Sequence, residues 1–214
     1  MTTTLTVLAD SFFAQVNTQL APLGFKGTKG DQAFRIRMKS GTGVAHYALV
    51  RHPGVDFEVM LDFGLRIDAV EELTNDVLPS LSGTERRKIV TLGVGYGNLV
   101  QGKSISWPIG CAEDVDLAVE EFTMAVVATG LPFFERYADI REAMVALGGN
   151  EPIHWLLSPL HDKRASRSTI MAYLLRDKGA FDMLAKEHED NLVARKHIGL
   201  ERFRELVASL RERW

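Results

Sequence analysis

One stretch of the chain has the residue types and spacing of a phosphate-binding loop. Residues 97–104, Gly-Asn-Leu-Val-Gln-Gly-Lys-Ser, match the pattern G-x-x-x-x-G-K-[ST]. In such a loop, backbone N–H groups surround the phosphates of a nucleotide, the lysine reaches the outer phosphates and the hydroxyl binds magnesium. The candidate ligand-binding residues are therefore Gly97, Gly102, Lys103 and Ser104. They would make this protein a nucleotide-binding enzyme.

The residues that follow this string do not predict the helix that a phosphate loop requires. Pro108 falls where the first turns of that helix should lie, and it biases Trp107 toward extended geometry. Ile105 and Trp107 alternate with serines, which is typical of a strand. The sequence therefore favours a hairpin with strands at 88–96 and 103–109 and a turn over 97–102. The phosphate loop remains the alternative.

Charged residues alternate with apolar ones along two predicted strands. Arg35 and Arg37 do so in one strand, and Asp56, Glu58 and Asp62 do so in another. A period of two is typical of a strand with one buried and one solvent-facing side. If the two strands lie side by side, their outer face is either an ordinary solvated surface or a polar face for a protein partner. These five residues are the candidate partner-binding residues.

Other ionisable clusters lack the spacing of known chemistry. His46 and His52 lie on or near one strand but have no third ligand at zinc-site spacing, so we predict no metal site. Residues 163–167, Lys-Arg-Ala-Ser-Arg, could hold a phosphate or an acidic partner, but the sequence favours an ordinary solvated loop, because short basic runs occur in many neutral proteins. His188 has no second histidine four residues away, unlike a zinc-protease helix. The sequence predicts neither catalytic residues nor a cofactor.

The composition indicates a folded, soluble chain. The 214 residues are 46% hydrophobic and carry a net charge of −3, so no basic excess favours nucleic-acid binding. Cys111 is the single cysteine, which excludes an internal disulfide and suits a reducing compartment. The first residues do not resemble a secretory signal, and the apolar runs are too short to span a bilayer. We therefore expect a cytoplasmic protein without membrane association.

Hydrophobic periodicity predicts a helix, then an antiparallel sheet, then further helices. The expected strands, joined by short turns, are 34–39, 44–51, 55–63 and the two strands of the hairpin. The expected helices are 4–20, 68–78, 113–130, 133–147, 168–178 and two more that end near 199 and 210. This segregation indicates an α+β fold with about five strands. Two domains, 1–110 and 111–214, are expected, or one continuous domain.

The N-terminal third of the chain resembles a family of uncharacterised bacterial proteins. The residues that carry the likeness are Leu-Ala-Pro-Leu-Gly-Phe-Lys-Gly at 20–27 and Phe-Arg-Ile-Arg at 34–37. Members of that family open with an amphipathic helix, pass through such a stretch and enter a strand with Phe and Arg. Some proteins of similar size look like immunity proteins, which neutralise a toxin by binding it. A well-formed core without an assembled catalytic site, together with charged sheet and helix faces, predicts a non-enzymatic module that binds a protein partner or forms a homodimer. The resemblance adds the narrower expectation of an immunity-type inhibitor.

Overall fold

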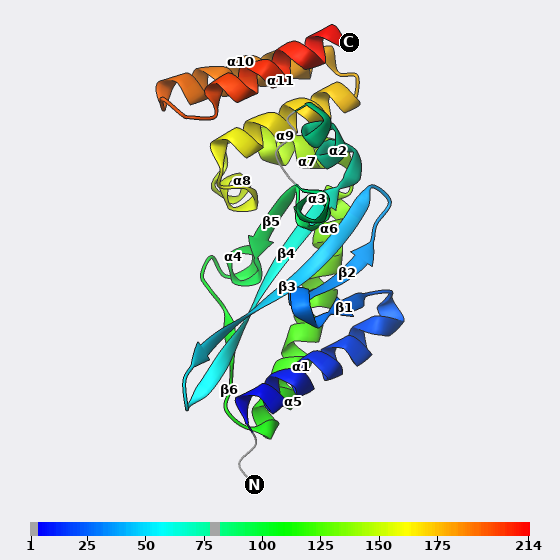
Figure 1. Ribbon diagram of the computed structural model, residues 1–214, viewed down its shortest axis with the longest axis vertical. Helices are drawn as coiled ribbons and strands as arrows, with labels where there is room; N and C mark the ends of the chain where they lie inside the picture. Colours follow the sequence, from blue (N-terminus) through cyan, green and yellow to red (C-terminus); the bar gives the residue numbers. More distant parts are fainter. Residues whose placement is uncertain (1–3, 78–81) are drawn as a thin grey trace. The chain divides into compact units, whose positions relative to one another are not determined.

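The computed structural model describes residues 4–77 and 82–214 (Figure 1). It confirms the α+β class, with an N-terminal helix, an antiparallel sheet and then helices. The chain divides into two compact units, each assembled from several segments. Unit 1 comprises 1–38, 42–64 and 94–135, and unit 2 comprises 39–41, 65–93 and 136–214. The predicted boundary at 110 does not separate them, because residues on each side of it contribute to both units.

The first helix of unit 1, α1 (Leu5–Leu20), follows its predicted range. The side chain of Thr4 caps its start by accepting a hydrogen bond from the backbone N–H of Val7. A short 3₁₀ turn, η1 (Ala21–Leu23), follows and ends at Gly24, whose φ of 91° lies in the left-handed region that favours glycine. The Pro-Leu-Gly stretch therefore terminates the helix.

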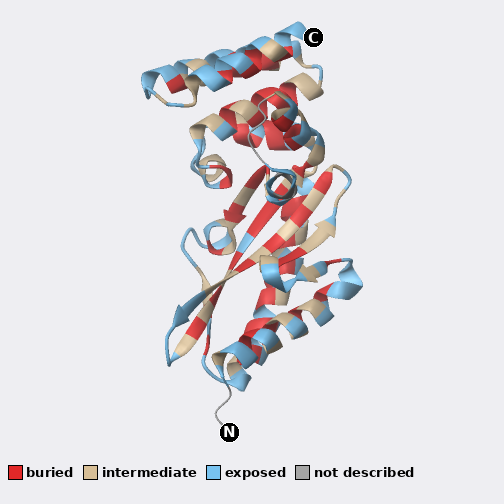
Figure 2. Cartoon of the chain, viewed as in Figure 1, coloured by how far each residue is buried: buried red, intermediate tan, exposed pale blue. Residues whose placement is uncertain are grey.

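The sheet has the strand order β1-β2-β3-β4-β5, and β6 also pairs with β4. Its strands are β1 (Lys26–Thr28), β2 (Ala33–Arg37), β3 (Gly41–His52), β4 (Asp56–Ile67), β5 (Leu92–Gly95) and β6 (Ser106–Ile109). β2 pairs antiparallel with β3, so that Phe34 lies opposite Ala45. Buried residues alternate with more exposed ones along β3 and β4, as the period of two predicted (Figure 2).

Aromatic side chains join α1 and α5 (Ala112–Ala125) to the inner face of the sheet. Phe12 of α1 makes an edge contact with Phe122 of α5, with ring centroids 5.4 Å apart. Phe34 and Tyr47 come from neighbouring strands, and their centroids are 5.7 Å apart. Burial, with a smaller effect of the nearby Asp10 charge, raises the pKa of Tyr47 to about 12. These contacts form the core of unit 1.

The hairpin predicted over 88–109 is wrong. Residue 88 ends a helix, α3 (Gly83–Lys88), and a second short helix, α4 (Tyr96–Val100), follows β5 directly. β6 pairs antiparallel with residues 57–60 of β4 instead of with β5. One edge of β4 is paired with β3. The other edge is shared by β5 and β6, and α4 lies between these two strands in the sequence. The apolar alternation identified strand residues but carried no information on their partner strand.

The helix predicted over 113–130 continues beyond Pro132. α5 passes through a π-helical segment, η3 (Val126–Gly130), into α6 (Leu131–Tyr137). In η3 the backbone N–H of Leu131 bonds to the carbonyl of Val126, five residues back. This wider turn directly precedes Pro132 and accommodates a residue that has no backbone N–H. The helix expected at 133–147 therefore begins later, as α7 (Ile140–Gly148), with Asp139 as its cap.

Among the described residues, Ala112–Tyr137 is the one helix long and apolar enough to cross a bilayer. Its inward side chains Val115, Val119 and Phe122 are buried in the core of unit 1. Such burial is typical of a core helix in a soluble domain, and length and composition alone are weak grounds for a membrane span.

Unit 2 is helical and is arranged around α9. Its remaining helices are α2 (Asp68–Val77), α8 (Pro152–Leu157), α9 (His161–Leu174), α10 (Lys178–Ala194) and α11 (Leu200–Glu212). α9 packs against α2, α7, α10 and α11. It begins at residue 161 instead of 168, so the predicted basic loop at 163–167 is helical. Arg164 and Arg167 occupy inward positions in its first turns, where an amphipathic helix usually has apolar residues. The apolar periodicity therefore did not indicate a helix there. Residue 78, the predicted end of α2, lies outside the described residues.

Candidate functional site

The phosphate-loop string does not have the strand-loop-helix context that nucleotide binding requires. Its first residues belong to α4, and β6 follows Ser104 after one further residue. A Cβ atom on Gly97 would lie 2.1 Å from the carbonyl oxygen of Lys103, so the two halves of the string pack on each other. Gly102 has a φ of 67° and turns the chain toward β6. The helix therefore begins before the string and ends within it, and we do not propose these residues as a nucleotide site.

The three carboxylates of β4 already have partners within the sheet. The Oδ1 of Asp56 lies 2.6 Å from Nδ1 of His52, and Oδ2 of Asp62 lies 3.9 Å from Nδ1 of His46. Glu58 Oε2 accepts a hydrogen bond of 2.6 Å from the hydroxyl of Ser106 on β6.

The predicted basic residues Arg35 and Arg37 lie on β2, and β3 separates them from the carboxylates of β4. Arg35 forms an ion pair of 3.2 Å with Asp31 and stands opposite Val44 of β3. Arg37 is exposed at the end of β2, opposite Thr42. The expectation that the two charged strands are neighbours is wrong, because β3 lies between β2 and β4. Partner binding by Arg35, Arg37 and the carboxylates of β4 stays a prediction.

An exposed apolar stripe lies on the outer side of α5 and η3. Leu117 and Met124 are each 58% exposed and Val127 is 41% exposed. Their spacings of seven and three residues place them on one side of the helix, and we call this set the outer stripe. Glu113 and Glu120 lie on the same side and are also exposed.

The segment that carries the outer stripe is strongly acidic. Residues 104–135 contain no lysine or arginine. Their acidic residues are Glu113, Asp114, Asp116, Glu120, Glu121 and Glu135. Of these, Asp114 accepts hydrogen bonds from the backbone N–H groups of Gly110 and Cys111 at the start of α5. The helix therefore combines exposed apolar groups with an uncompensated negative charge.

The basic segment at 163–167 divides between two environments in unit 2. Arg167 pairs with Glu71 of α2, with Nε 2.8 Å from Oε1, and both side chains are buried. This pair borders a cleft of about 160 Å³. Arg164 instead lines a separate cavity with His161 and His188. Sequence analysis did not connect these residues, although 161, 164 and 168 form a polar stripe at helical spacing.

No group of three or more His, Cys, Asp or Glu side chains in the described ranges is arranged to hold a metal ion. No protein-family model, curated protein or solved structure matches this chain. The resemblance to a bacterial family therefore stays a prediction.

Proposed function

We propose that this protein binds another protein through the outer stripe of α5 and η3. The observation that carries the proposal is the exposure of Leu117, Met124 and Val127 on one side of a helix that is flanked by carboxylates alone. Exposed apolar groups gathered on one face and rimmed by charges are typical of protein interaction sites.

The spacing and charge of this face define the partner. Glu113, Leu117, Glu120, Met124 and Val127 are alternately four and three residues apart, which is the spacing of a coiled-coil seam. A helix with its own apolar seam packs into such a surface. Lysines or arginines beside that seam would complement the carboxylates and steer association. A second copy of this chain would place carboxylates against carboxylates, so a different protein with a basic amphipathic helix is the partner.

The finer form of the proposal is an immunity-type inhibitor that neutralises a toxin in the cytoplasm. The family resemblance supports this form, and the single exposed thiol of Cys111 suits a reducing compartment. The charged sheet face predicted from Arg35, Arg37, Asp56, Glu58 and Asp62 would then be a secondary contact.

Site-specific photo-crosslinking in the source cell tests the proposal. A benzophenone side chain placed at residue 117 should crosslink to a protein, whereas one at Val145 of α7, also 58% exposed, should not crosslink to that protein. The crosslinked partner is then purified and titrated against variants. We expect Leu117→Arg and Met124→Arg to weaken its binding at least about tenfold and Val145→Arg to leave it unchanged.

Folding controls are simple because these side chains are exposed, and their replacement should change stability by no more than about 0.5 kcal/mol. Three outcomes contradict the proposal: no crosslink from residue 117, a crosslink to a second copy of this chain or to lipid, and wild-type affinity of the partner for Leu117→Arg.

A further inference from the structure

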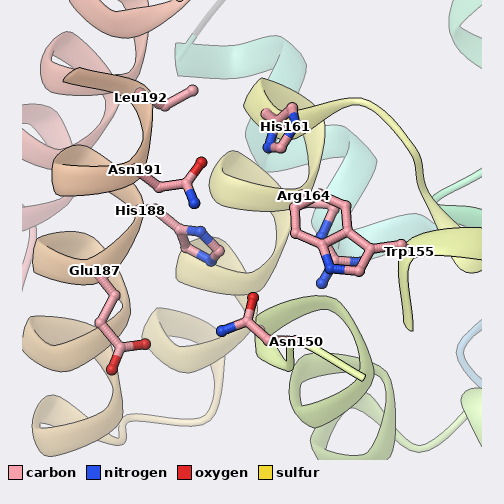
Figure 3. Close-up of a pocket in the computed structure, with 9 residues that line it drawn as sticks. Asn150, Trp155, His161, Arg164, Glu187, His188, Asn191 and Leu192 are labelled. Atoms are coloured by element: carbon pink, nitrogen blue, oxygen red, sulfur yellow. The ribbon is translucent and has the colours of Figure 1, made fainter. Parts of the chain in front are cut away.

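Unit 2 contains a small polar cavity that the proposed function does not use. Its volume is about 40 Å³. Side chains from α9, α10 and the segment around α8 surround it (Figure 3). The polar and aromatic ones that matter are Asn150, Trp155, His161, Arg164, His188 and Asn191. Given the volume that one water molecule needs, the cavity has room for roughly three water molecules.

The cavity contains a buried cation without a counter-ion. Arg164 is 1% exposed, and its guanidinium lies over the ring of Trp155 at 4.2 Å from the centroid. It donates to the backbone carbonyls of His154 and Gly149, which leaves three of its five N–H groups. No carboxylate in the described ranges forms an ion pair with it. A buried charge in this condition costs free energy that an anion would recover.

An amide donor and an imidazole line the cavity beside Arg164. Asn191 accepts a hydrogen bond of 3.0 Å on its amide oxygen from Nε of Arg195. Its NH₂ group is therefore left for the cavity, and Figure 3 shows it pointing toward the ring of His188. The Ser168 hydroxyl donates to the carbonyl of Arg164 and so accepts from Nε2 of His188 at 2.8 Å, which leaves Nδ1 of the neutral imidazole as an acceptor.

Among the described residues that line the cavity, Arg164 carries the one positive charge. Burial, and then the charges of Arg164 and His161, lower the pKa of His188 to about 4. Burial and neighbouring cations also lower the pKa of His161. Both imidazoles are therefore neutral at pH 7. Glu187 lies at the margin, with its carboxylate on the side away from Arg164 (Figure 3).

We propose that this cavity binds the carboxylate group of a small monocarboxylic acid. One guanidinium matches one negative charge, and its remaining N–H groups match the two oxygens of a carboxylate. The cavity has the size of such a group and excludes a bulky one. A dianion such as phosphate would exceed the single positive charge of Arg164.

Calorimetric titration of the wild-type protein with acetate and with acetamide, at pH 7.5 and constant ionic strength, tests the charge requirement. Acetate should bind with a dissociation constant of roughly 1 mM or lower, and acetamide, of the same shape, should not bind detectably. Phosphate should bind at least about tenfold more weakly than acetate. Equal heats for acetate, acetamide and chloride would overturn the proposal.

Asn191→Asp locates the site. The new carboxylate, although 3.0 Å from Nε of Arg195, would add a negative charge to the wall of the cavity, so acetate affinity should fall at least about tenfold. Met183→Asp adds the same charge to an exposed position of α10 and should bind acetate like the wild type. Arg164→Gln is less suitable, because Arg164 also holds two backbone carbonyls. If Asn191→Asp binds acetate as tightly as the control, the assignment to this cavity is wrong.

Discussion

Two arginines three residues apart on α9 are buried in chemically different ways. Arg167 has Glu71 as a resident counter-ion, with Nε 2.8 Å from Oε1. Breaking a buried pair of this kind costs about 3–5 kcal/mol because one charge is left uncompensated. Arg164 is equally buried but meets backbone carbonyls and an aromatic ring. The presence or absence of one carboxylate therefore separates a structural arginine from one available to a ligand.

His188 makes the stability of unit 2 depend on pH. Its pKa in the folded chain is lowered to about 4, whereas an unfolded histidine titrates near 6.5. As the pH falls below 6.5, the unfolded chain takes up a proton that the folded chain does not, and stability falls until about pH 4. The full loss is roughly 3 kcal/mol. The stabilising contribution is present above the unfolded pKa.

Urea unfolding of the wild type and of His188→Gln, at pH 7.0 and 5.0 in chloride buffers, measures this dependence. The variant should lose less stability than the wild type between the two pH values, because the neutral amide cannot take up the proton. Carboxylates that titrate in the same pH range are present in both proteins. Their contribution therefore cancels when the stability loss of the variant is subtracted from that of the wild type. Identical losses in the two proteins would show that His188 is not the responsible group.

At the scale of elements, the turn between α4 and β6 depends on two glycines for different reasons. A Cβ atom on Gly97 would lie 2.1 Å from the carbonyl oxygen of Lys103 and 2.6 Å from the backbone N of Ile105. Backbone atoms cannot move aside easily, so Gly97→Ala should destabilise by about 2 kcal/mol or more. Gly102 has open space around it but a φ of 67°, so Gly102→Ala should cost about 1–2 kcal/mol.

Chemical denaturation of both alanine variants, with Gly83→Ala as the control, measures this difference. Gly83 has open space and no positive φ, and it lies in the first turn of α3. Its replacement should have little effect on stability. If Gly97→Ala is as stable as Gly83→Ala, the packing of the string on itself is incorrect.

Periodicity within a segment predicted the helices and strands of this fold better than it predicted which strands pair with each other. The period of two identified β3 and β4, and the spacing of Leu8, Phe12 and Val16 identified α1, because both signals lie within one element. The pairing of β6 with β4 joins residues about 50 positions apart, and alternation within a strand says nothing about such a partner. The start of α9 was missed because its inward residues are arginines.

The candidate sites depend on packing even more than the sheet does. Ser168 and His188 belong to different helices and meet only because α10 packs against α9. Glu71 and Arg167 are 96 residues apart in the sequence and meet only because α2 packs against α9. By contrast, the acidic composition of residues 104–135 is visible in the sequence, and only the exposure of Leu117 and Met124 needed the structure.

At the scale of the whole molecule, the chain order and the compact units do not correspond. Unit 2 draws 65–93 from the first half of the chain, and unit 1 draws 112–135 from the second half. A chain divided at residue 110 therefore removes the counter-ion of Arg167 from unit 2. It also exposes Val119 and Phe122, which are fully buried in unit 1.

A fragment of residues 111–214 should therefore not fold cooperatively by itself, although the C-terminal half is entirely helical. The loss of Glu71 alone leaves an uncompensated charge worth about 3–5 kcal/mol, which is a large part of a typical domain's stability. Circular dichroism should show a broad thermal transition and reduced helix content. Arg167→Met in the fragment should restore part of the helix content, because it removes the unpaired charge.

The matched control is the full chain with a protease site inserted between Gly110 and Cys111, which are both exposed. After cleavage its two pieces should remain associated and unfold cooperatively, because α5 still packs on α1 and α9 on α2. A sharp transition of the isolated fragment at the full chain's melting temperature would mean that the second half is an autonomous domain.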